Sequence, residues 1–401
     1  MSGGIKMTEL GVLAYPDLSP MEKIKEYLQL ASKYGFTRVS SSMLSVEGTN
    51  EEIISYFKEF NQIAHKFGMK VSLDVNTNFL KRMNQSYDDI SLFHDINCDI
   101  IRLDGSYGAE NDYIMIQNPY GIKIEMNATS SKIAKEIAYF YEKGVSKERI
   151  LLGHNAYPQR YTGLKWKDFL EKNHQLKSYG YKIAAIVSSN APNTHGIWNA
   201  EDGLPTVERL RDLPIDLQTR IILATGEVDD ILIGNAYATE AELKAISEVV
   251  KPTKAFEDSP IYAEIKAYGP ILPKFGPCKR LKVILEKDIT KIEKENLLDL
   301  VPQLDNGDSS EWIWRSRSGR LINRNRPIPP RNYDGEYFPV GSVVVVNDVN
   351  KHYSGEIQIV KIPIKNDGKR NLIARLAPNE EQMLELINNE DLVEFIEYYE
   401  Y

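Results

Sequence analysis

The sequence ILLGHNAYPQRYTG, residues 150–163, joins a short apolar run to a dense group of polar side chains. Ile150, Leu151 and Leu152 predict a buried strand. Five polar residues follow at its C-terminal end: His154, Asn155, Tyr157, Gln159 and Arg160. A connecting loop needs turn formers such as Gly153 and Pro158, but it has no structural need for so many other polar groups. The stretch therefore predicts a strand that ends in a functional site, and an ordinary polar loop is the alternative.

The same pattern recurs along the N-terminal part of the chain. Short apolar runs alternate with longer amphipathic ones, which indicates repeated βα units. The predicted strands are 10–15, 37–42, 70–75, 100–104, 122–127, 150–155, 183–188 and 231–235. Eight such units in about 250 residues predict a TIM (β/α)8 barrel. A doubly wound sheet would need a Gly-rich loop after its first strand, where Tyr15, Pro16, Asp17 and Leu18 stand instead.

Two of the intervening segments show clear helical spacing. Residues 19–34 and 49–67 place apolar side chains on one face, as in Ile53, Phe57 and Phe60. Asn50, followed by two glutamates, is the predicted N-cap of the second helix.

The rhythm changes after residue 250. Residues 251–278 are rich in proline and predict a linker with one short helix over 261–268. Predicted strands then follow at 281–285, 342–347, 356–360, 372–376 and 392–398, with a helix at 380–387. Asp367-Gly368 predicts a hairpin between two of these strands. The chain is thus expected to hold a TIM barrel (1–250), a linker (251–278) and a small, mainly antiparallel β-barrel (279–401).

Composition limits the class of function. The chain has 401 residues and a net charge of −8, which argues against general binding to nucleic acid or to an anionic membrane. A small anionic substrate needs only a few local arginines. Cys98 and Cys278 have no cysteine or histidine at metal-ligand spacing, so neither a disulfide framework nor a zinc site is expected. No signal peptide or long apolar run is present, which predicts a cytoplasmic protein.

Active sites of TIM barrels lie at the C-terminal ends of the strands. Here those ends carry many polar residues: Tyr15, Ser42, Asp74, Asn76, Arg102, Asp104, Glu125, Asn127, His154, Asn155, Ser188, Ser189 and Asn235. Three of them, Asp74, Asp104 and Glu125, are carboxylates on consecutive strands. Paired carboxylates serve as general acid, base or nucleophile. The alternatives are an ion-pair network with Arg102, Arg160 or Lys123, and a metal site to which His154 would add a ligand.

Anion recognition has two candidate regions. Ser188-Ser189-Asn190 and Gly234-Asn235 follow the last two barrel strands, whose loops frequently bind phosphate. Trp198 in the first of these loops has the shape to stack on a sugar, although a lone tryptophan is more often a packing residue. In the second domain, Arg315, Arg317 and Arg320 lie in the run WRSRSGR, which is either an anion clamp or a solvated basic turn.

Several longer motifs carry a resemblance to a known family. They are LGVLAYPDLS, SSMLSVEG, MKVSLDV, RLDG with NPYGIKIEMN, GHNAYPQRYTGL, VSSN, DGLPTVERLRDLP, DDILIGNAYAT, WRSRSGR, HYSGEIQI and NDGKRNLIARL. Together they resemble the family once called DUF871 or "outer surface protein", the MupG-like 6-phospho-N-acetylmuramidases of glycoside hydrolase family 170. Asp202 stands where the resemblance leads us to expect a glutamate.

The resemblance implies a TIM barrel followed by a cyclophilin-like β-barrel. It also implies cytoplasmic hydrolysis of N-acetylmuramic acid 6-phosphate-β-1,4-N-acetylglucosamine in cell-wall recycling. We expect Asp104 and Glu125 as the leading catalytic pair, with Asp74 as the third candidate. The expected substrate-binding residues are Tyr15, Arg102, Asn127, His154, Asn155, Gln159, Arg160, Ser188, Ser189, Asn235, Arg315 and Arg320.

No metal or other cofactor is expected, and the predicted partner is the phosphorylated disaccharide. A homodimer is an open alternative to a monomer. A metal-dependent sugar-phosphate epimerase or aldolase, and a non-catalytic sugar-binding protein, remain the alternative functions.

Overall fold

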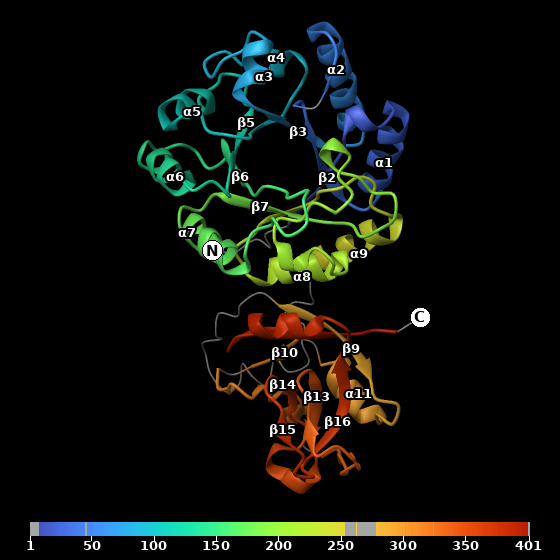
Figure 1. Ribbon diagram of the computed structural model, residues 1–401. Coiled ribbons are helices and arrows are strands. Elements are labelled where there is room, and N and C mark those ends of the chain that lie inside the picture. The colour runs from blue at the N-terminus through green and yellow to red at the C-terminus, as the bar shows by residue number, and fades with distance from the viewer. Residues whose placement is uncertain are drawn as a thin grey trace. The chain divides into compact units, whose positions relative to one another are not determined.

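The computed structural model describes residues 8–44, 46–252, 262, 278–300, 302–305, 307–323 and 325–399. The chain divides into two compact units, Met1–Lys251 and Pro252–Tyr401 (Figure 1), and each is described by itself. The helix predicted over 261–268 and most of the predicted linker lie outside the described residues.

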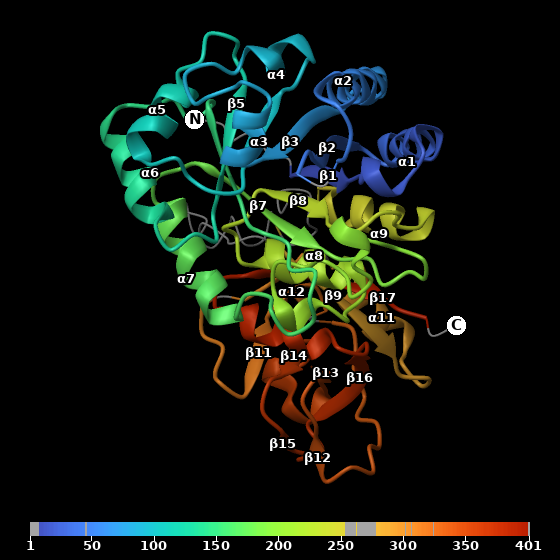
Figure 2. The same ribbon diagram turned by 45° about the horizontal axis from the view of Figure 1, so that its top comes forward.

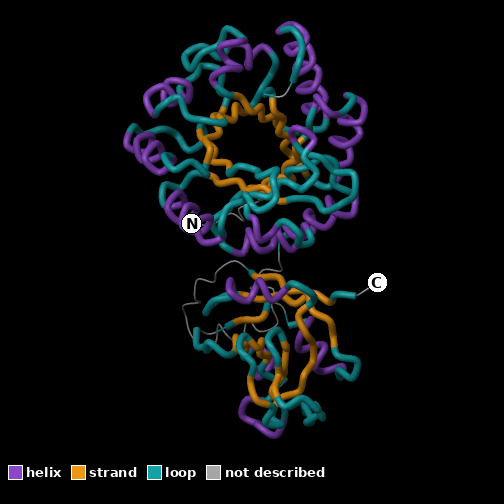
Figure 3. The backbone as a smooth tube through the Cα atoms, in the orientation of Figure 1, coloured by secondary structure: helices purple, strands orange, loops and turns teal. Residues whose placement is uncertain are grey.

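The first unit is a closed barrel of eight parallel strands in sequence order, which confirms the predicted TIM barrel. Figure 3 shows these strands as a ring with helices around its outside. The strands are β1 Glu9–Leu13, β2 Phe36–Ser42, β3 Lys70–Val75, β4 Ile100–Leu103, β5 Lys123–Asn127, β6 Ile150–Gly153, β7 Lys182–Val187 and β8 Asp230–Ile233. The predicted bounds differ from these by at most two residues at either end.

The outer helices follow the strands along the chain. They are α1 Met21–Lys33, α2 Asn50–Lys66, α3 Thr77–Arg82, α4 Ser91–Asp95, α5 Ala109–Ile116, α6 Ile133–Glu142, α7 Trp166–Lys177, α8 Ile215–Ala224 and α9 Glu240–Val250. Short 3-10 turns lie at η1 Pro16–Leu18, η2 Ile197–Asn199 and η3 Glu208–Leu210. Helix α2 buries the apolar stripe that its spacing predicts, including Ile53, Phe57 and Phe60.

The predicted N-cap of α2 is wrong by one residue. Thr49 is the cap, because its side chain accepts a hydrogen bond from the Glu52 N–H at 3.2 Å. The Glu52 carboxylate in turn accepts one from the Thr49 N–H at 2.8 Å. This reciprocal capping box satisfies two N–H groups, whereas Asn50 uses its amide to donate to the Arg82 carbonyl.

The second unit contains a seven-stranded sheet in the order β10-β17-β9-β16-β13-β14-β11. Its strands are β9 Lys279–Leu285, β10 Gln303–Leu304, β11 Ile313–Ser316, β13 Ser342–Val346, β14 Ile357–Val360, β16 Arg370–Leu376 and β17 Leu392–Glu397. Only the β9–β17 pairing is parallel. The Leu304 N–H donates to Ser316 Oγ at 3.2 Å, so edge strands β10 and β11 approach each other and the sheet is nearly closed. Figure 2 shows β11, β14, β13 and β16 side by side.

The other elements of this unit are β12 Tyr337–Phe338, β15 Ile364–Lys365, α11 Lys291–Leu298, α12 Ser318–Ile322, η5 Asp348–Tyr353 and η6 Glu380–Leu386. The helix predicted at 380–387 is therefore a 3-10 segment. The predicted hairpin at Asp367-Gly368 is wrong, because the turn separates β15, which pairs with β12, from β16, which pairs with β13 and β9. Asn366 donates to the Tyr333 and Gly335 carbonyls and so holds the start of this turn to the segment before β12.

The barrel interior has two chemically different sides. Ala184, Ile186 and Leu232 form an apolar cluster on β7 and β8. Arg38 and Ser72, from β2 and β3, are buried and hydrogen bonded to each other at 3.1 Å. Within the described part of the chain, no helix is long and apolar enough to span a bilayer.

A buried arginine joins the loops that follow β6 and β7. Arg211 is 1% exposed and donates to the carbonyls of Tyr157, Asp202 and Gly203 at 3.0–3.1 Å. It also pairs with the Glu208 carboxylate at 2.6 Å. That carboxylate accepts the N–H groups of Tyr161 and Gly163, each at 2.7 Å. One ion pair thus satisfies backbone groups of both loops.

Replacing Arg211 with methionine should lower the free energy of unfolding by about 3 kcal/mol, because several buried acceptors lose their donor. Chemical denaturation of the purified protein measures this loss. The exposed neighbour Arg209, which stacks on Trp166, provides the matched control Arg209→Met with an effect below about 1 kcal/mol. Equal effects of the two variants would contradict the role given to Arg211.

Candidate active site

A chain of charged side chains runs through the polar side of the barrel. Strand pairing places Asp74 of β3 beside Arg102 of β4, and Arg102 beside Glu125 of β5. Alternation along each strand directs such neighbours to the same face, which here is the interior. Arg38 of β2 reaches the same group by its contact with Glu125 of β5, two strands beyond β3.

Glu125 lies between two arginines. Its side chain is 3% exposed, and one carboxylate oxygen accepts a hydrogen bond from Arg38 Nη2. The other oxygen accepts from Arg102 Nη1 at 2.6 Å. Burial alone would raise the pKa of Glu125, but the charges of Arg38 and Arg102 outweigh it and lower the pKa. The predicted alternative of an ion-pair network thus describes this residue.

Arg102 distributes its donors over several acceptors. Besides Glu125, it donates to Asn155 Oδ1 at 2.6 Å and to the Gly153 carbonyl at 3.2 Å. Its Nε lies 3.9 Å from a carboxylate oxygen of Asp74. Position 153 must be glycine, because a Cβ there would lie 1.9 Å from Glu125 Oε1 and 2.5 Å from Arg102 Nη1. The missing side chain therefore makes room for the ion pair.

Asp74 is the carboxylate of this group with an unusual proton affinity. Burial raises its pKa to about 7, with the charges of Asp104 and Glu125 adding to the rise and Arg102 opposing it. Its side chain remains 26% exposed. Its Oδ1 atom is buried and accepts no hydrogen bond from the residues that the structure describes. A partly exposed carboxyl group whose pKa lies near neutral pH can donate a proton to a bound molecule.

Asp104 and Asn127 lie at the same end of the barrel. Asp104 directly follows β4 and is exposed, and its backbone N–H donates to the Val75 carbonyl at 3.0 Å. The Asn127 amide donates to the Asp104 carbonyl at 3.4 Å and accepts from the Thr129 N–H at 2.9 Å. These contacts fix the backbone of Asp104 directly after β4, the strand next to that of Asp74.

His154 does not face the barrel mouth. It is 1% exposed, its Nε2 lies 2.7 Å from Asn173 Oδ1 on α7, and its ring packs 5.0 Å from that of Phe169. Burial lowers its pKa to about 4, so the ring is neutral. The expectation of a ligand-binding or metal-binding histidine is corrected here. Successive residues alternate sides, so with Asn155 turned toward Arg102 the histidine side chain turns toward the helices.

The serine and asparagine groups after β7 and β8 bind one another. Asn235 accepts from the Ser189 N–H at 2.8 Å and donates to the Ser189 carbonyl and to Thr194 Oγ1. Ser188 Oγ accepts from the Leu204 N–H at 3.0 Å. Ser188 and Asn235 are at most 1% exposed, so their predicted contact with phosphate is corrected to an internal role. Tyr15 likewise is buried and donates to the Gly234 carbonyl.

A pocket beside this loop contains Arg160. It is lined by Arg160, Ser189, Asn190, Ala191, Thr194, Glu201, Asp202, Gly203 and Asp212. Arg160 donates to both carboxylate oxygens of Asp212, at 3.0 and 2.7 Å, and lies 3.9 Å from Asp202. The pocket is acidic on balance, so an anion there would have to displace Asp212. Gln159 is exposed, and Trp198 is 69% exposed on the same loop as Asp202.

The arginines of the second unit are also paired. Glu356 is fully buried and accepts from Arg315 at 2.9 and 2.6 Å and from Arg320 at 3.5 Å. The Tyr353 ring lies against both guanidinium groups. The run WRSRSGR is therefore neither a solvated turn nor a set of uncompensated cations.

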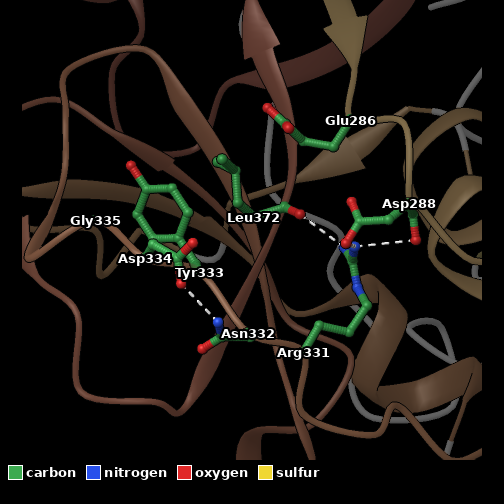
Figure 4. Close-up of a pocket in the computed structure, with 8 residues that line it drawn as sticks. All are labelled: Glu286, Asp288, Arg331, Asn332, Tyr333, Asp334, Gly335 and Leu372. Atoms are coloured by element: carbon green, nitrogen blue, oxygen red, sulfur yellow. Dashed lines mark hydrogen bonds and ion pairs between the residues drawn. The ribbon is translucent and has the colours of Figure 1, made fainter.

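A separate pocket in this unit is shown in Figure 4. Its lining residues are Glu286, Asp288, Arg331, Asn332, Tyr333, Asp334, Gly335 and Leu372. Arg331 pairs with Asp288 and donates to the Leu372 carbonyl at 2.7 Å. Its charge is thus balanced inside the pocket.

Sequence reasoning missed Arg38. It lies inside a predicted strand, and its side chain is 1% exposed. An arginine within a barrel strand otherwise made of serines and apolar residues was the available signal. Among the residues that the structure describes, no three histidine, cysteine, aspartate or glutamate side chains are grouped to hold a metal ion.

Two solved structures resemble this chain over nearly its full length. A solved structure described as an uncharacterized B. cereus protein shares 30% identity, with a TM-score of 0.82 over 97% of this chain and 99% of that chain. A conserved protein of unknown function from Enterococcus faecalis shares 21% identity and the fold, with a TM-score of 0.64 over 97% of this chain and 96% of that chain. No curated protein sequence matches.

Family models match both units. The model described as "6-phospho-N-acetylmuramidase, N-terminal" covers residues 10–248, and its C-terminal counterpart covers residues 279–396. Because these matches span most of the sequence, the chain belongs to the 6-phospho-N-acetylmuramidase family.

Proposed function

We propose that the protein is a cytoplasmic 6-phospho-N-acetylmuramidase. It would hydrolyse the β-1,4 bond between N-acetylmuramic acid 6-phosphate and N-acetylglucosamine during cell-wall recycling. Family membership supports the substrate class. The observation that supports the chemistry is Asp74, a partly exposed carboxyl at the barrel mouth whose pKa is raised to about 7.

Asp74 is the proposed general acid. Glycoside hydrolysis needs a protonated carboxyl beside the leaving oxygen and a second carboxyl at the anomeric centre. Asp74 keeps its proton near neutral pH, and after donating it the new carboxylate lies 3.9 Å from Arg102. Arg102 would therefore stabilise the charge that forms as the glycosidic bond breaks.

Asp104 is the proposed second carboxyl. It is exposed and lies one strand away from Asp74, where it can attack the anomeric carbon, activate water, or orient the substrate's acetamido group. Glu125 is poorly suited to either task, because two arginines hold its carboxylate inside the barrel. The proposed pair is thus Asp74 and Asp104 in place of the expected Asp104 and Glu125.

Substrate recognition is proposed around this pair. Arg102 donates to Asn155 and lies 3.9 Å from Asp74, and Asn127 donates to the Asp104 backbone carbonyl, so these three side chains lie at the same end of the barrel as the pair. Arg160 and Ser189 line the acidic pocket. A role in binding the sugar or its phosphate stays a prediction for Arg160, Gln159, Ser189, Arg315 and Arg320.

The direct test of function is incubation of the purified protein with the 6-phosphorylated muramyl disaccharide and with its unphosphorylated form, with and without EDTA. Mass spectrometry follows the products. Cleavage of the phosphorylated form alone, insensitive to EDTA, is expected. Cleavage of neither disaccharide would refute the proposed activity, and loss of cleavage in EDTA would favour a metal-dependent enzyme.

Asp74→Asn should lower kcat by at least about 100-fold and leave the melting temperature unchanged, because a general acid contributes about that much. In the wild type, kcat/KM should fall as pH rises through about 7, since only protonated Asp74 can donate. A pH–rate profile with no alkaline decline between pH 6 and 9 would remove Asp74 from this role.

Glu125→Gln should destabilise the fold by about 3 to 5 kcal/mol, because two buried arginines lose their counter-charge. Chemical denaturation measures the change. Asp104→Asn is the matched control, since this exposed carboxyl should leave stability within about 0.5 kcal/mol. A Glu125→Gln protein as stable as the wild type would show that Glu125 is not the centre of the ion-pair network.

A further inference from the structure

The Arg38 guanidinium lies deeper in the barrel than the proposed catalytic carboxyls. It donates through Nη2 to Glu125 and, at 3.1 Å, to Ser72 Oγ. Nothing else in the described part of the chain accepts a hydrogen bond from its Nε or Nη1. Burying an arginine with unused donors lowers stability, and an apolar side chain of similar size would fill the same space with a smaller loss of stability. Its presence is therefore better explained by what it does to Glu125.

The other carboxylates near Arg38 have lysine partners of their own. Glu9 of β1 pairs with Lys70 at 2.7 Å, and Asp230 of β8 lies 3.8 Å from Lys182. Glu125 of β5 has no lysine partner and is bound by Arg38 and Arg102 alone among the ion pairs of the described chain. The strongest electrostatic link of Arg38 thus runs to Glu125.

Arg102 connects Glu125 to Asp74 at the mouth of the barrel. Arg102 lies 2.6 Å from Glu125 and 3.9 Å from Asp74, so both carboxylates share its charge. The charged groups that act on Asp74 are Arg102 of β4, Asp104 directly after β4, and Glu125 of β5. If Glu125 lost Arg38, it would draw Arg102 inward and away from Asp74.

We propose that Arg38 is a positioning residue of the reaction: by holding one oxygen of Glu125, it keeps Arg102 shared between Glu125 and Asp74. This inference rests on the proposed function, because it concerns the group assigned as the general acid. Arg38 itself lies 1% exposed and touches no substrate.

Two variants should move the proton affinity of Asp74 in opposite directions. In Arg38→Met, Glu125 keeps its charge and attracts Arg102. The alkaline limb of the pH profile, meaning the pH at which kcat/KM declines on the alkaline side, should therefore rise by about one pH unit. In the double variant Arg38→Met/Glu125→Gln, the Glu125 charge is gone and Arg102 is free to approach Asp74. Its limb should move below that of the wild type.

Ser72→Ala is the matched control, because it removes the neutral hydrogen bond to Arg38 and no charge. Its limb should coincide with that of the wild type. If Arg38 only fills the core, Arg38→Met will lower the melting temperature while its limb coincides with that of the wild type, which overturns the proposal. Should Arg38→Met fail to fold, Arg38→Gln, which also removes the charge but keeps an N–H donor, replaces it with the same two outcomes.

A second readout separates this proposal from the proposed activity. Carbon-13 NMR of labelled aspartate carboxyls, assigned with Asp74→Asn, follows the titration of Asp74 without substrate. Opposite shifts of its midpoint in the two variants would support the positioning role even in a protein that cleaves neither disaccharide. Unchanged midpoints would overturn that role even in an active enzyme.

Discussion

The interaction on which the site depends is the Glu125 carboxylate held between Arg38 and Arg102 inside the barrel. Removing three charges from water is expensive, and the cost is offset only while each charge keeps its partners. Arg102 comes from β4, next to the Glu125 strand β5, whereas Arg38 reaches Glu125 from β2, and Gly153 leaves the space that the Glu125–Arg102 pair occupies. Because Glu125 neutralises much of the Arg102 charge, Asp74 can remain a protonated acid beside an arginine.

The two sides of the barrel interior therefore differ in function: one packs the core and the other carries the charged groups. The apolar cluster on β7 and β8 packs the interior, and the loops above those strands are held by Asn235, Ser188 and Arg211. On the ionic side, formed by β2 to β5, Arg102 and Glu125 act on the pKa of Asp74 at the mouth. The chain belongs to the 6-phospho-N-acetylmuramidase family, and Asp74 and Asp104 are the proposed carboxyl pair for cleavage of a glycosidic bond.

The barrel was predictable from sequence because its signal is local: each strand is a short apolar run, and each α-helix carries its own apolar stripe. Asp74 and Asp104 were candidates because strand ends mark the barrel mouth, and their catalytic role stays a prediction. The pairing of Glu125 with Arg102 was one of the predicted alternatives. The contact of Glu125 with Arg38 and the internal partners of His154 and Asn235 were not predicted, because they depend on residues 19 to 87 positions away and on which side of a strand a residue faces. The turn at Asp367-Gly368 was recognised, but turn chemistry does not choose the strand that β16 pairs with.

Asp74 is the proposed donor of the proton to the glycosidic oxygen. A crystal structure of the Asp74→Asn variant, soaked with the uncleaved 6-phosphorylated disaccharide, tests this role. The side chain at position 74 is expected to lie within about 3 Å of the glycosidic oxygen, with Glu125 still bound to both arginines. A glycosidic oxygen that instead contacts Glu125, or lies far from position 74, would contradict it.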